Sequence, residues 1–214
     1  MDDRLCLILA GGDPAPLPDR LPDEPDLVIA ADSGIHLAEE LGLTVDVVVG
    51  DLDSASPDAI ERARRAGAAI ERHPEDKDAT DLELALHAAL ERRVERVVIV
   101  GGTSLERVDH FLANAAVIAS PQFAAIAVEW WLRSSRVIVA RAGVAITGSA
   151  GDLVSIIPVG GDTQVSTSGL RWPLDRERLT QGSTRGVSNE MLATTAIVEV
   201  AAGTALVVHT RREP

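Results

Sequence analysis

Three aspartates early in the chain each follow a short apolar run: Asp13 after LILAGG, Asp32 after LVIAA and Asp51 after DVVVG. The carboxyl ends of parallel strands meet at one edge of a sheet, where α/β folds bind ligands, so these side chains are expected to share that edge. Aspartate is also a common turn and helix-capping residue. For Asp13 the turn reading is preferred, and for Asp32 both readings stay open.

A second aspartate follows Asp51 closely, in the sequence Gly50-Asp51-Leu52-Asp53-Ser54. In extended backbone, residues two apart point the same way, which would bring the carboxylates of Asp51 and Asp53 to one side. Several carboxylates facing one crevice repel one another unless a cation lies between them. Mg²⁺ takes oxygen ligands and is usually shared between carboxylates and substrate phosphates. We therefore predict that this cluster is functional and holds a metal ion.

A further acidic run, residues 75–81, contains Lys77, the only lysine of the chain. Asp81 would lie in the first turn of a helix, where it stabilises the helix dipole by about 0.3–1 kcal/mol, and this alone explains its presence. Helix N-termini are also phosphate sites. Lys77 can therefore hold a phosphate while Asp81 holds a metal, and from these residues alone both readings stay open.

The sequence GGTSLERVDH, residues 101–110, follows an apolar run and leads into a helical pattern, which is the position of a phosphate-binding turn. It matches neither the P-loop nor the dinucleotide-binding glycine pattern. Arg107 can neutralise phosphate oxygens as a bidentate donor, and Asp109 can bind a metal or an adenosine hydroxyl. A solvated Arg107–Asp109 pair is the simpler reading of these two residues.

Apolar runs without alternation are typical of strands buried on both faces of a parallel sheet. Such strands are expected at Leu5–Ala10, Leu27–Ala31, Asp46–Val49 and Val97–Val100.

Helix signals separate these runs. Ser56 is a natural N-cap before Pro57, and Gly67 ends that helix. Thr80 and Glu83 have the spacing of a capping box, and Val108–Ala119 forms a further apolar helix. We predict a βαβ-type domain over residues 1–125.

After about Ala125 the pattern changes to short β-branched runs separated by glycines, with weak helical periodicity. The predicted strands are Arg136–Ala140, Leu153–Pro158, Gln164–Thr167, Ala196–Ala201 and Ala205–Thr210. Ala202-Gly203 is interpreted as a hairpin turn between the last two. Residues 126–214 are thus expected to form an antiparallel sandwich or jelly-roll-like domain.

Composition limits the possible partners. The chain has 214 residues and a net charge of −13, which argues against nucleic acid and implies that a polyanion such as ATP would need cations for binding. No apolar run approaches the roughly 18 residues of a membrane helix, and the N-terminus carries acids where a signal peptide carries bases. With Cys6 as its single cysteine, the chain is expected to act in the cytoplasm.

Taken together, six motifs resemble those of the thiamine pyrophosphokinase family, in order and spacing, across nearly the whole chain. They are A-D-x-G at residues 31–34, G-D-x-D-S at 50–54, K-D-x-T-D at 77–81, G-x-x-x-x-R-x-D-H at 102–110, G-L-[KR]-W at 169–172 and G-I-S-N-E at 186–190, where Val187 replaces the isoleucine.

The resemblance implies a Rossmann-like catalytic domain, a C-terminal β-sandwich and a homodimer with active sites at the subunit interface. The reaction would be attack of the thiamine hydroxyl on the β-phosphorus of ATP, giving thiamine diphosphate and AMP. Mg²⁺ would be held by Asp51, Asp53 and Asp81, and Lys77 would assist catalysis. The nucleotide and its phosphates would contact Asp32, Gly34, Asp78, Thr80, Arg107, Asp109 and His110.

For the thiamine pocket, the resemblance implies Trp172, Ser188 and Asn189. A tryptophan face attracts cations by about 0.5–2 kcal/mol, which suits the permanent charge of thiamine. Without the family, a core tryptophan would be an equal reading of Trp172. Trp130 and Trp131 are expected to pack at the domain junction.

One departure concerns Leu105-Glu106, where the family usually has two glycines. Glycines let the backbone approach a nucleotide closely, so this change bears on ATP affinity or nucleotide preference. Two alternatives to thiamine diphosphate synthesis remain. One is diphosphate transfer to another hydroxymethyl acceptor such as a pterin, and the other is a regulator that binds nucleotide or thiamine without catalysis.

Overall fold

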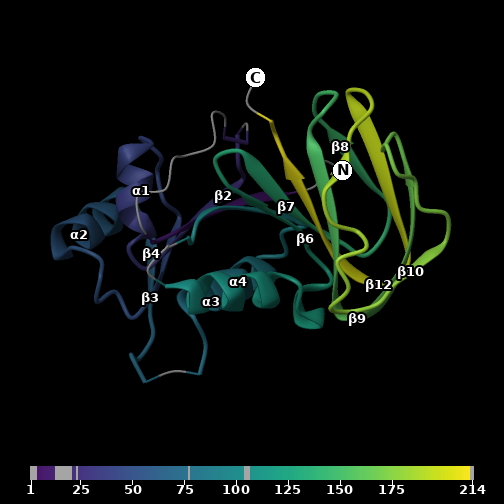
Figure 1. Cartoon of the computed structure of the whole chain (residues 1–214). Coiled ribbons are helices and arrows are strands. Elements are labelled where there is room, and N and C mark those ends of the chain that lie inside the picture. The colour runs from purple at the N-terminus through teal and green to yellow at the C-terminus, as the bar shows by residue number, and fades with distance from the viewer. Residues whose placement is uncertain (1–3, 13–20, 23, 77, 104–106, 213–214) are drawn as a thin grey trace. The chain divides into compact units, whose positions relative to one another are not determined.

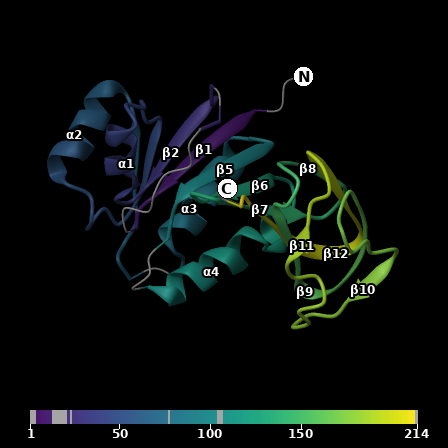
Figure 2. The same cartoon turned by 45° about the horizontal axis from the view of Figure 1, so that its top comes forward.

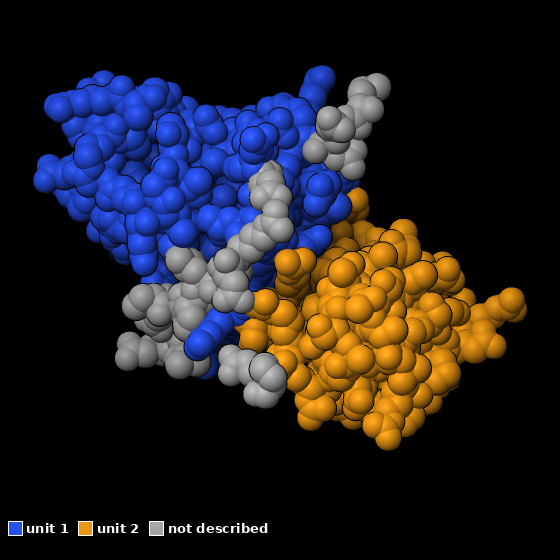
Figure 3. Space-filling view, turned by 90° about the horizontal axis from the view of Figure 1, so that it is seen from above, with its two compact units in different colours: residues 1–118, 125–133 blue, residues 119–124, 134–214 orange. Residues whose placement is uncertain are grey.

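The computed structural model describes residues 4–12, 21–22, 24–76, 78–103 and 107–212. Asp13, Lys77 and Leu105-Glu106 lie outside the described residues. The chain divides into two compact units (Figure 3): unit 1 comprises Met1–Ile118 and Ala125–Arg133, and unit 2 comprises Ala119–Ala124 and Ser134–Pro214. Within the described ranges, none of the helices has the length and hydropathy that crossing a membrane requires.

The strands of unit 1 pair in parallel in the order β6-β5-β1-β2-β3-β4 (Figure 1). Their bounds are β1 Leu5–Ala10, β2 Leu27–Ala31, β3 Val47–Gly50, β4 Ala69–Arg72, β5 Arg96–Gly101 and β6 Ala127–Trp131. All residues of β1 and β2 are buried, as the unbroken apolar runs predict.

Two of these strands were not expected from the sequence. β4 is AIER, with exposed and half-buried residues, because it is the last strand of the parallel order. β6 is AVEWW and alternates between buried and less buried positions. It pairs in parallel with β5, so unit 1 extends to Arg133 and differs from the predicted domain of residues 1–125.

The helices of unit 1 are α1 Gly34–Glu40, α2 Pro57–Ala66, α3 Asp81–Glu91 and α4 Val108–Ile118. Side chains of α1 and α2 share a core cluster with Leu5, Leu7 and Leu9 of β1. α3 and α4 cover the opposite side of the sheet (Figure 2). Two predicted N-caps are confirmed. Ser56 accepts a hydrogen bond from the Ala59 amide, Thr80 accepts one from the Glu83 amide, and each has a length of 3.3 Å.

Unit 2 is antiparallel, as predicted for the second half of the chain. Its strands are β7 Ser135–Ala140, β8 Val144–Thr147, β9 Leu153–Ser168, β10 Glu177–Leu179, β11 Asn189–Glu190 and β12 Thr195–Thr210, with a short 3₁₀ helix at Pro121–Phe123. β12 pairs with β7, β8 and β9, while β10 and β11 pair with β9. Alternating buried positions of β9 and β12 form the core of this unit.

The predicted hairpin at Ala202-Gly203 is wrong. Residues 195–210 form one strand, because both halves pair with the same partner: Val200 lies opposite Val165 and Thr204 opposite Val159. The register shifts between 200 and 204 mark a β-bulge, and Gly203 there has a φ of 86°. The two strands predicted at 153–158 and 164–167 likewise form the single strand β9. A glycine within a strand can mark a bulge as well as a turn, and the local sequence does not separate the two.

Candidate active site

A pocket of about 500 Å³ opens in unit 1 at the carboxyl ends of the parallel strands, beside the N-termini of α3 and α4. It is lined by residues 10–12, 31–33, 79–82 and 102–103, together with Ser54, Glu75, Arg107, His110 and Asn114. Four of the six sequence motifs contribute residues to this pocket, which lies at the sheet edge where α/β folds bind ligands.

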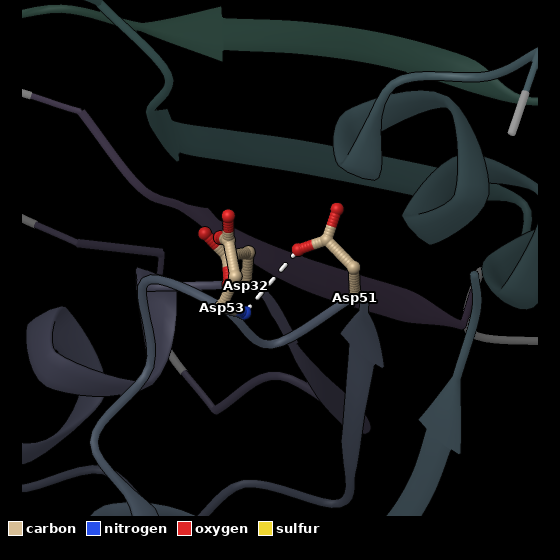
Figure 4. Close-up of side chains that lie close together, drawn as sticks. All are labelled: Asp32, Asp51 and Asp53. Carbon is tan, nitrogen blue, oxygen red and sulfur yellow. Dashed lines mark hydrogen bonds between the residues drawn. The ribbon is translucent and has the colours of Figure 1, made fainter. Parts of the chain in front are cut away.

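Asp32, Asp51 and Asp53 converge beside this pocket (Figure 4), each offering a carboxylate oxygen within 4.8 Å of the others. The backbone between Asp51 and Asp53 is not extended, because Leu52 is left-handed with a φ of 64°. Leu52 is buried, and the Asp53 amide donates a hydrogen bond of 3.3 Å to Asp51 Oδ1. The two carboxylates therefore meet through a tight turn, which differs from the extended geometry expected from their spacing.

The carboxylate of Asp32 is the most constrained of the three. Its Oδ1 is buried and has no hydrogen-bond partner among the described residues. Burial raises the pKa of Asp32, and the charges of Asp81, Asp53 and Asp51 raise it further against the lowering effect of the Ser33 amide. A buried oxygen without a donor, beside two further carboxylates, fits a hard cation with oxygen ligands such as Mg²⁺.

Asp81 lies next to this cluster but outside the group of three. Its Oδ1 is so close to Gly50 that a Cβ added there would lie 2.8 Å away, and Gly50 has a φ of 142°. Asp81 lines the pocket at the first turn of α3, next to Thr80, whose hydroxyl oxygen is engaged as the N-cap. Asp78 is exposed and does not line the pocket.

Glycines bring two backbone turns together at the pocket. A Cβ on Gly11 would lie 2.0 Å from Ser33 Oγ, and a Cβ on Gly101 would lie 2.1 Å from the Ala10 carbonyl oxygen. Gly34, predicted to contact the nucleotide, is buried instead where a Cβ would lie 2.0 Å from the Leu9 carbonyl oxygen. It does not line the pocket, and it permits α1 to pack closely on β1.

Two residues that the sequence reasoning did not assign to the site hold the turn after β5. Asn114 Nδ2 donates a hydrogen bond of 3.0 Å to the Gly102 carbonyl, and Trp130 Nε1 donates one of 2.7 Å to the Gly101 carbonyl. Trp130 was expected at the domain junction. It is fully buried, and its ring lies 5.2 Å from that of Phe111 in the same unit. The available sequence signal for Asn114 was a polar side chain within the apolar helical run of residues 108–119.

Arg107 and Asp109 form the solvated pair that was the simpler reading of this motif. Arg107 Nε and Nη2 donate hydrogen bonds of 3.1 and 3.0 Å to the Asp109 carboxylate, and both side chains are more than half exposed. The hydrogen bonds from Arg107 lower the pKa of Asp109 to about 2. His110 Nε2 also contacts Arg107 Nη2, and both residues line the pocket.

The three predicted thiamine residues lie together in unit 2. Asn189 is buried; its Oδ1 accepts a 3.0 Å hydrogen bond from the Trp172 amide, and its Nδ2 donates one of 2.6 Å to the Trp172 carbonyl. Trp172 is 51% exposed, so it is not a core residue of this unit. Ser188 is left-handed, with a φ of 61°, and its amide donates to Ser155 Oγ. Asn189 therefore fixes Trp172 through the backbone.

Comparisons with known proteins agree with these two constellations. Residues 19–129 match the family model "Thiamin pyrophosphokinase, catalytic domain", and residues 144–205 match "Thiamin pyrophosphokinase, vitamin B1 binding domain". The first range holds the pocket's acidic and basic residues, and the second holds Trp172, Ser188 and Asn189.

A thiamine pyrophosphokinase of Bacillus subtilis is 28% identical over 207 residues, covering 94% of this chain and 96% of that protein. Among solved structures, a thiamine pyrophosphokinase from Bacillus subtilis superposes with a TM-score of 0.84 at 24% identity, covering 98% of this chain and all of the other. A thiamin pyrophosphokinase from Candida albicans gives a TM-score of 0.72 at 15% identity over 98% and 90% of the two chains.

The two models cover separate ranges in the order in which the catalytic and the vitamin-binding parts were expected, and the matched ranges contain all six motifs. The first model alone spans more than half of the chain. The chain therefore belongs to the thiamin pyrophosphokinase family.

Proposed function

We propose that the chain transfers a diphosphate group from ATP to the hydroxyl of thiamine, giving thiamine diphosphate and AMP. The observation that carries this proposal is the buried Oδ1 of Asp32, which has no hydrogen-bond partner in the described part of the chain and lies beside Asp51 and Asp53 at a pocket of about 500 Å³. Such a volume suits a nucleotide-sized ligand, and such an oxygen suits a cation shared with its phosphates.

Asp51 and Asp53 are proposed to hold Mg²⁺ together with Asp81, which lies in the first turn of α3. Asp32, predicted from the family motif as a nucleotide residue, is added to the metal set because its carboxylate belongs to the same cluster. When bound, Mg²⁺ would offset the charge of the phosphates and of these carboxylates. The acidic residues then orient the polyphosphate rather than repel it.

ATP is proposed to occupy the pocket with its phosphates between the first turn of α3 and the turn after β5. The amides of a helix N-terminus favour an anion there, and Thr80 keeps this terminus in place as its N-cap. Arg107 and Lys77 would contact the phosphates. For this, the hydrogen bonds from Arg107 to Asp109 would be replaced by hydrogen bonds from Arg107 to phosphate oxygens. Asp78 and His110 are the remaining proposed nucleotide contacts, of which His110 lines the pocket.

Thiamine is proposed to bind at Trp172, Ser188 and Asn189. The ring of Trp172 already attracts one cation, because the guanidinium carbon of Arg171 lies 5.1 Å from the ring centroid. The thiazolium cation of thiamine would use the same property of the ring. Positioning of the hydroxyl against the β-phosphorus, together with charge neutralisation, would account for catalysis.

Each chain is proposed to comprise a Rossmann-like catalytic domain and a β-sandwich thiamine-binding domain. Two chains are proposed to form a homodimer with active sites at the subunit interface. Support comes from α4, where Val108, Phe111 and Leu112 are 58, 37 and 62% exposed. Apolar side chains exposed together on one helix favour burial against another surface. A cytoplasmic location is proposed because a single, buried cysteine needs no oxidising compartment.

The test is product analysis by purified protein given ATP, thiamine and Mg²⁺. Thiamine diphosphate and AMP should form in equal amounts, and EDTA should abolish both. Turnover of a hydroxymethylpterin in place of thiamine would reassign the acceptor. Binding of both substrates without AMP release would identify a non-catalytic regulator.

A further inference from the structure

A carboxylate and an imidazole form a buried pair in unit 2, outside the six motifs. Asp152 and His209 are 3 and 5% exposed, and His209 Nε2 lies 2.8 Å from Asp152 Oδ2. The same oxygen accepts a 2.9 Å hydrogen bond from the Ser149 amide, and Oδ1 accepts one of 3.1 Å from the Arg212 amide. Both carboxylate oxygens are therefore hydrogen-bonded, as a buried charge requires.

The space around this pair is closely fitted. A Cβ added to Gly148 would lie 2.6 Å from both Asp152 Oδ2 and His209 Nε2. The pair thus ties the end of β12 to the turn between β8 and β9, and a glycine is required beside it. Nothing in the proposed reaction uses these two side chains directly.

The backbone of the same turn leads to the proposed thiamine residues. The Met191 amide donates a hydrogen bond to the Asp152 carbonyl, and the Gly151 amide donates one to the Met191 carbonyl. Each has a length of 2.8 Å. Met191 is buried and forms a β-bridge with Leu170, two residues before Trp172. Two residues before Met191 lies Asn189, whose side chain holds the Trp172 backbone at both its amide and its carbonyl.

We propose that Asp152 and His209 are positioning residues for thiamine: they fix segment 189–192 and, through it, the orientation of Trp172. The imidazole holds the Asp152 side chain, and the Asp152 backbone holds Met191. Segment 190–192 then holds residues 169–171 through the Leu170–Met191 bridge and the backbone hydrogen bonds beside it. This inference rests on the proposed function in placing thiamine at Trp172. It predicts that breaking the pair weakens thiamine binding selectively, because the nucleotide residues lie in unit 1.

The same unit offers a matched control. Asp162, on β9, accepts a hydrogen bond of 2.8 Å from Arg178 Nε and one of 3.0 Å from the Gln181 amide. This side chain likewise joins an ion pair to a backbone amide, but its partners belong to residues 178–181, with no hydrogen bond to residues 169–172 or 189–192 among the described contacts. Asp162→Asn should therefore change stability without changing thiamine affinity.

The experiment compares wild type, His209→Leu, His209→Gln and Asp162→Asn as full chains. Steady-state kinetics with thiamine and ATP varied separately are combined with hydrogen exchange of residues 169–172 and 189–192. We expect His209→Leu to raise KM for thiamine about tenfold, with kcat and KM for ATP within about twofold of wild type. His209→Gln keeps an N–H donor toward Asp152 and should restore most of the affinity, while Asp162→Asn should match wild type in KM for thiamine.

Hydrogen exchange decides the positioning claim independently of turnover. Faster exchange of residues 189–192 in His209→Leu, reversed in His209→Gln, supports it, and unchanged exchange overturns it. An unchanged KM for thiamine in a folded, active His209→Leu variant also overturns it, as would an equal rise in Asp162→Asn. A wild-type protein that forms no thiamine diphosphate would count against the proposed function alone, because the exchange data would still decide whether the pair holds this segment.

Discussion

The carboxylate of Asp32 lies on a left-handed residue, with a φ of 47°, directly after β2. Non-glycine residues rarely adopt this conformation, and such strain is found most often at functional sites. Here it turns the side chain toward Asp51 and Asp53, where one carboxylate oxygen is buried without a donor among the described residues. At the residue scale, the site is thus an unfavourable arrangement that a bound cation would stabilise.

The first prediction concerns pH. Burial first, and then the charges of Asp81, Asp53 and Asp51, raise the pKa of Asp32 above its ordinary 3.8. A folded-state pKa above the unfolded value means that the folded chain binds this proton more tightly, so the associated stability is present below the ordinary pKa and is lost as pH rises through the raised one. We expect Asp32→Asn to be more stable than wild type at pH 7 without divalent cations.

The measurement is the free energy of unfolding of both proteins in urea, in EDTA, between pH 4 and 8. The advantage of Asp32→Asn should shrink toward pH 4, and adding Mg²⁺ should stabilise wild type more than the variant. A pH-independent difference would show that the acidic cluster does not repel as described.

The second prediction concerns turnover. Asp51→Asn keeps the shape of the side chain but removes its charge, so it should lower kcat by about 100-fold or more without unfolding the protein. Asp58→Asn changes an exposed acid on α2 and is the matched control, with near-wild-type kcat expected. Near-wild-type turnover of Asp51→Asn would contradict the metal assignment.

At the scale of elements, α2 and α3 start with the same device: Ser56 and Thr80 each accept a hydrogen bond from the amide three residues on. Only Thr80 lines the pocket. Comparing substitutions of Ser56 and Thr80 can therefore distinguish the contribution of an N-cap to stability from its contribution to ligand binding.

The third prediction uses this pair. Ser56→Ala and Thr80→Ala should each lower the free energy of unfolding by about 1 kcal/mol, the usual cost of losing an N-cap. Thr80→Ala should also raise KM for ATP several-fold, because the amides at the start of α3 would no longer be held toward the phosphates. Equal KM values for ATP in both variants would remove α3 from the proposed phosphate site.

At the scale of the whole molecule, α4 has few buried positions for such an apolar sequence: only Asn114 and Ile118 are buried. Its first turns present Val108, Phe111 and Leu112 to solvent, next to Arg107 and His110 of the pocket. Joining a second subunit along α4 would thus bury apolar surface beside the site.

The fourth prediction is that the protein is a dimer by light scattering and that Leu112→Glu shifts it to monomer, because a charge would replace an apolar contact at the interface. Turnover should fall with dimer content. Ile197→Glu, at an exposed position on β12, is the control and should remain dimeric. A dimeric Leu112→Glu protein would place the interface elsewhere.

Much of the chain could be interpreted from local sequence. The unbroken apolar runs of β1 and β2, the caps at Ser56 and Thr80 and the glycine after α2 act within a few residues, so their patterns predict the elements directly. The same holds for the family, because its six motifs are short stretches of sequence. The exposed strand β4 has no such pattern, since its pairing with β3 and not its own apolarity makes it a strand.

Tertiary structure decided what depends on contacts between distant residues. The bulge in β12 looks like a hairpin in sequence, and only the shared pairing with β9 distinguishes the two. Asp32 joins Asp51 and Asp53 because β2 and β3 are neighbours, and Trp130 supports the Gly101 turn because β6 lies beside β5. The sequence by itself determined the residue types, most of the elements and the family, whereas carboxylate convergence and side-chain support of the turns arise from strand pairing, which brings together residues far apart in the chain.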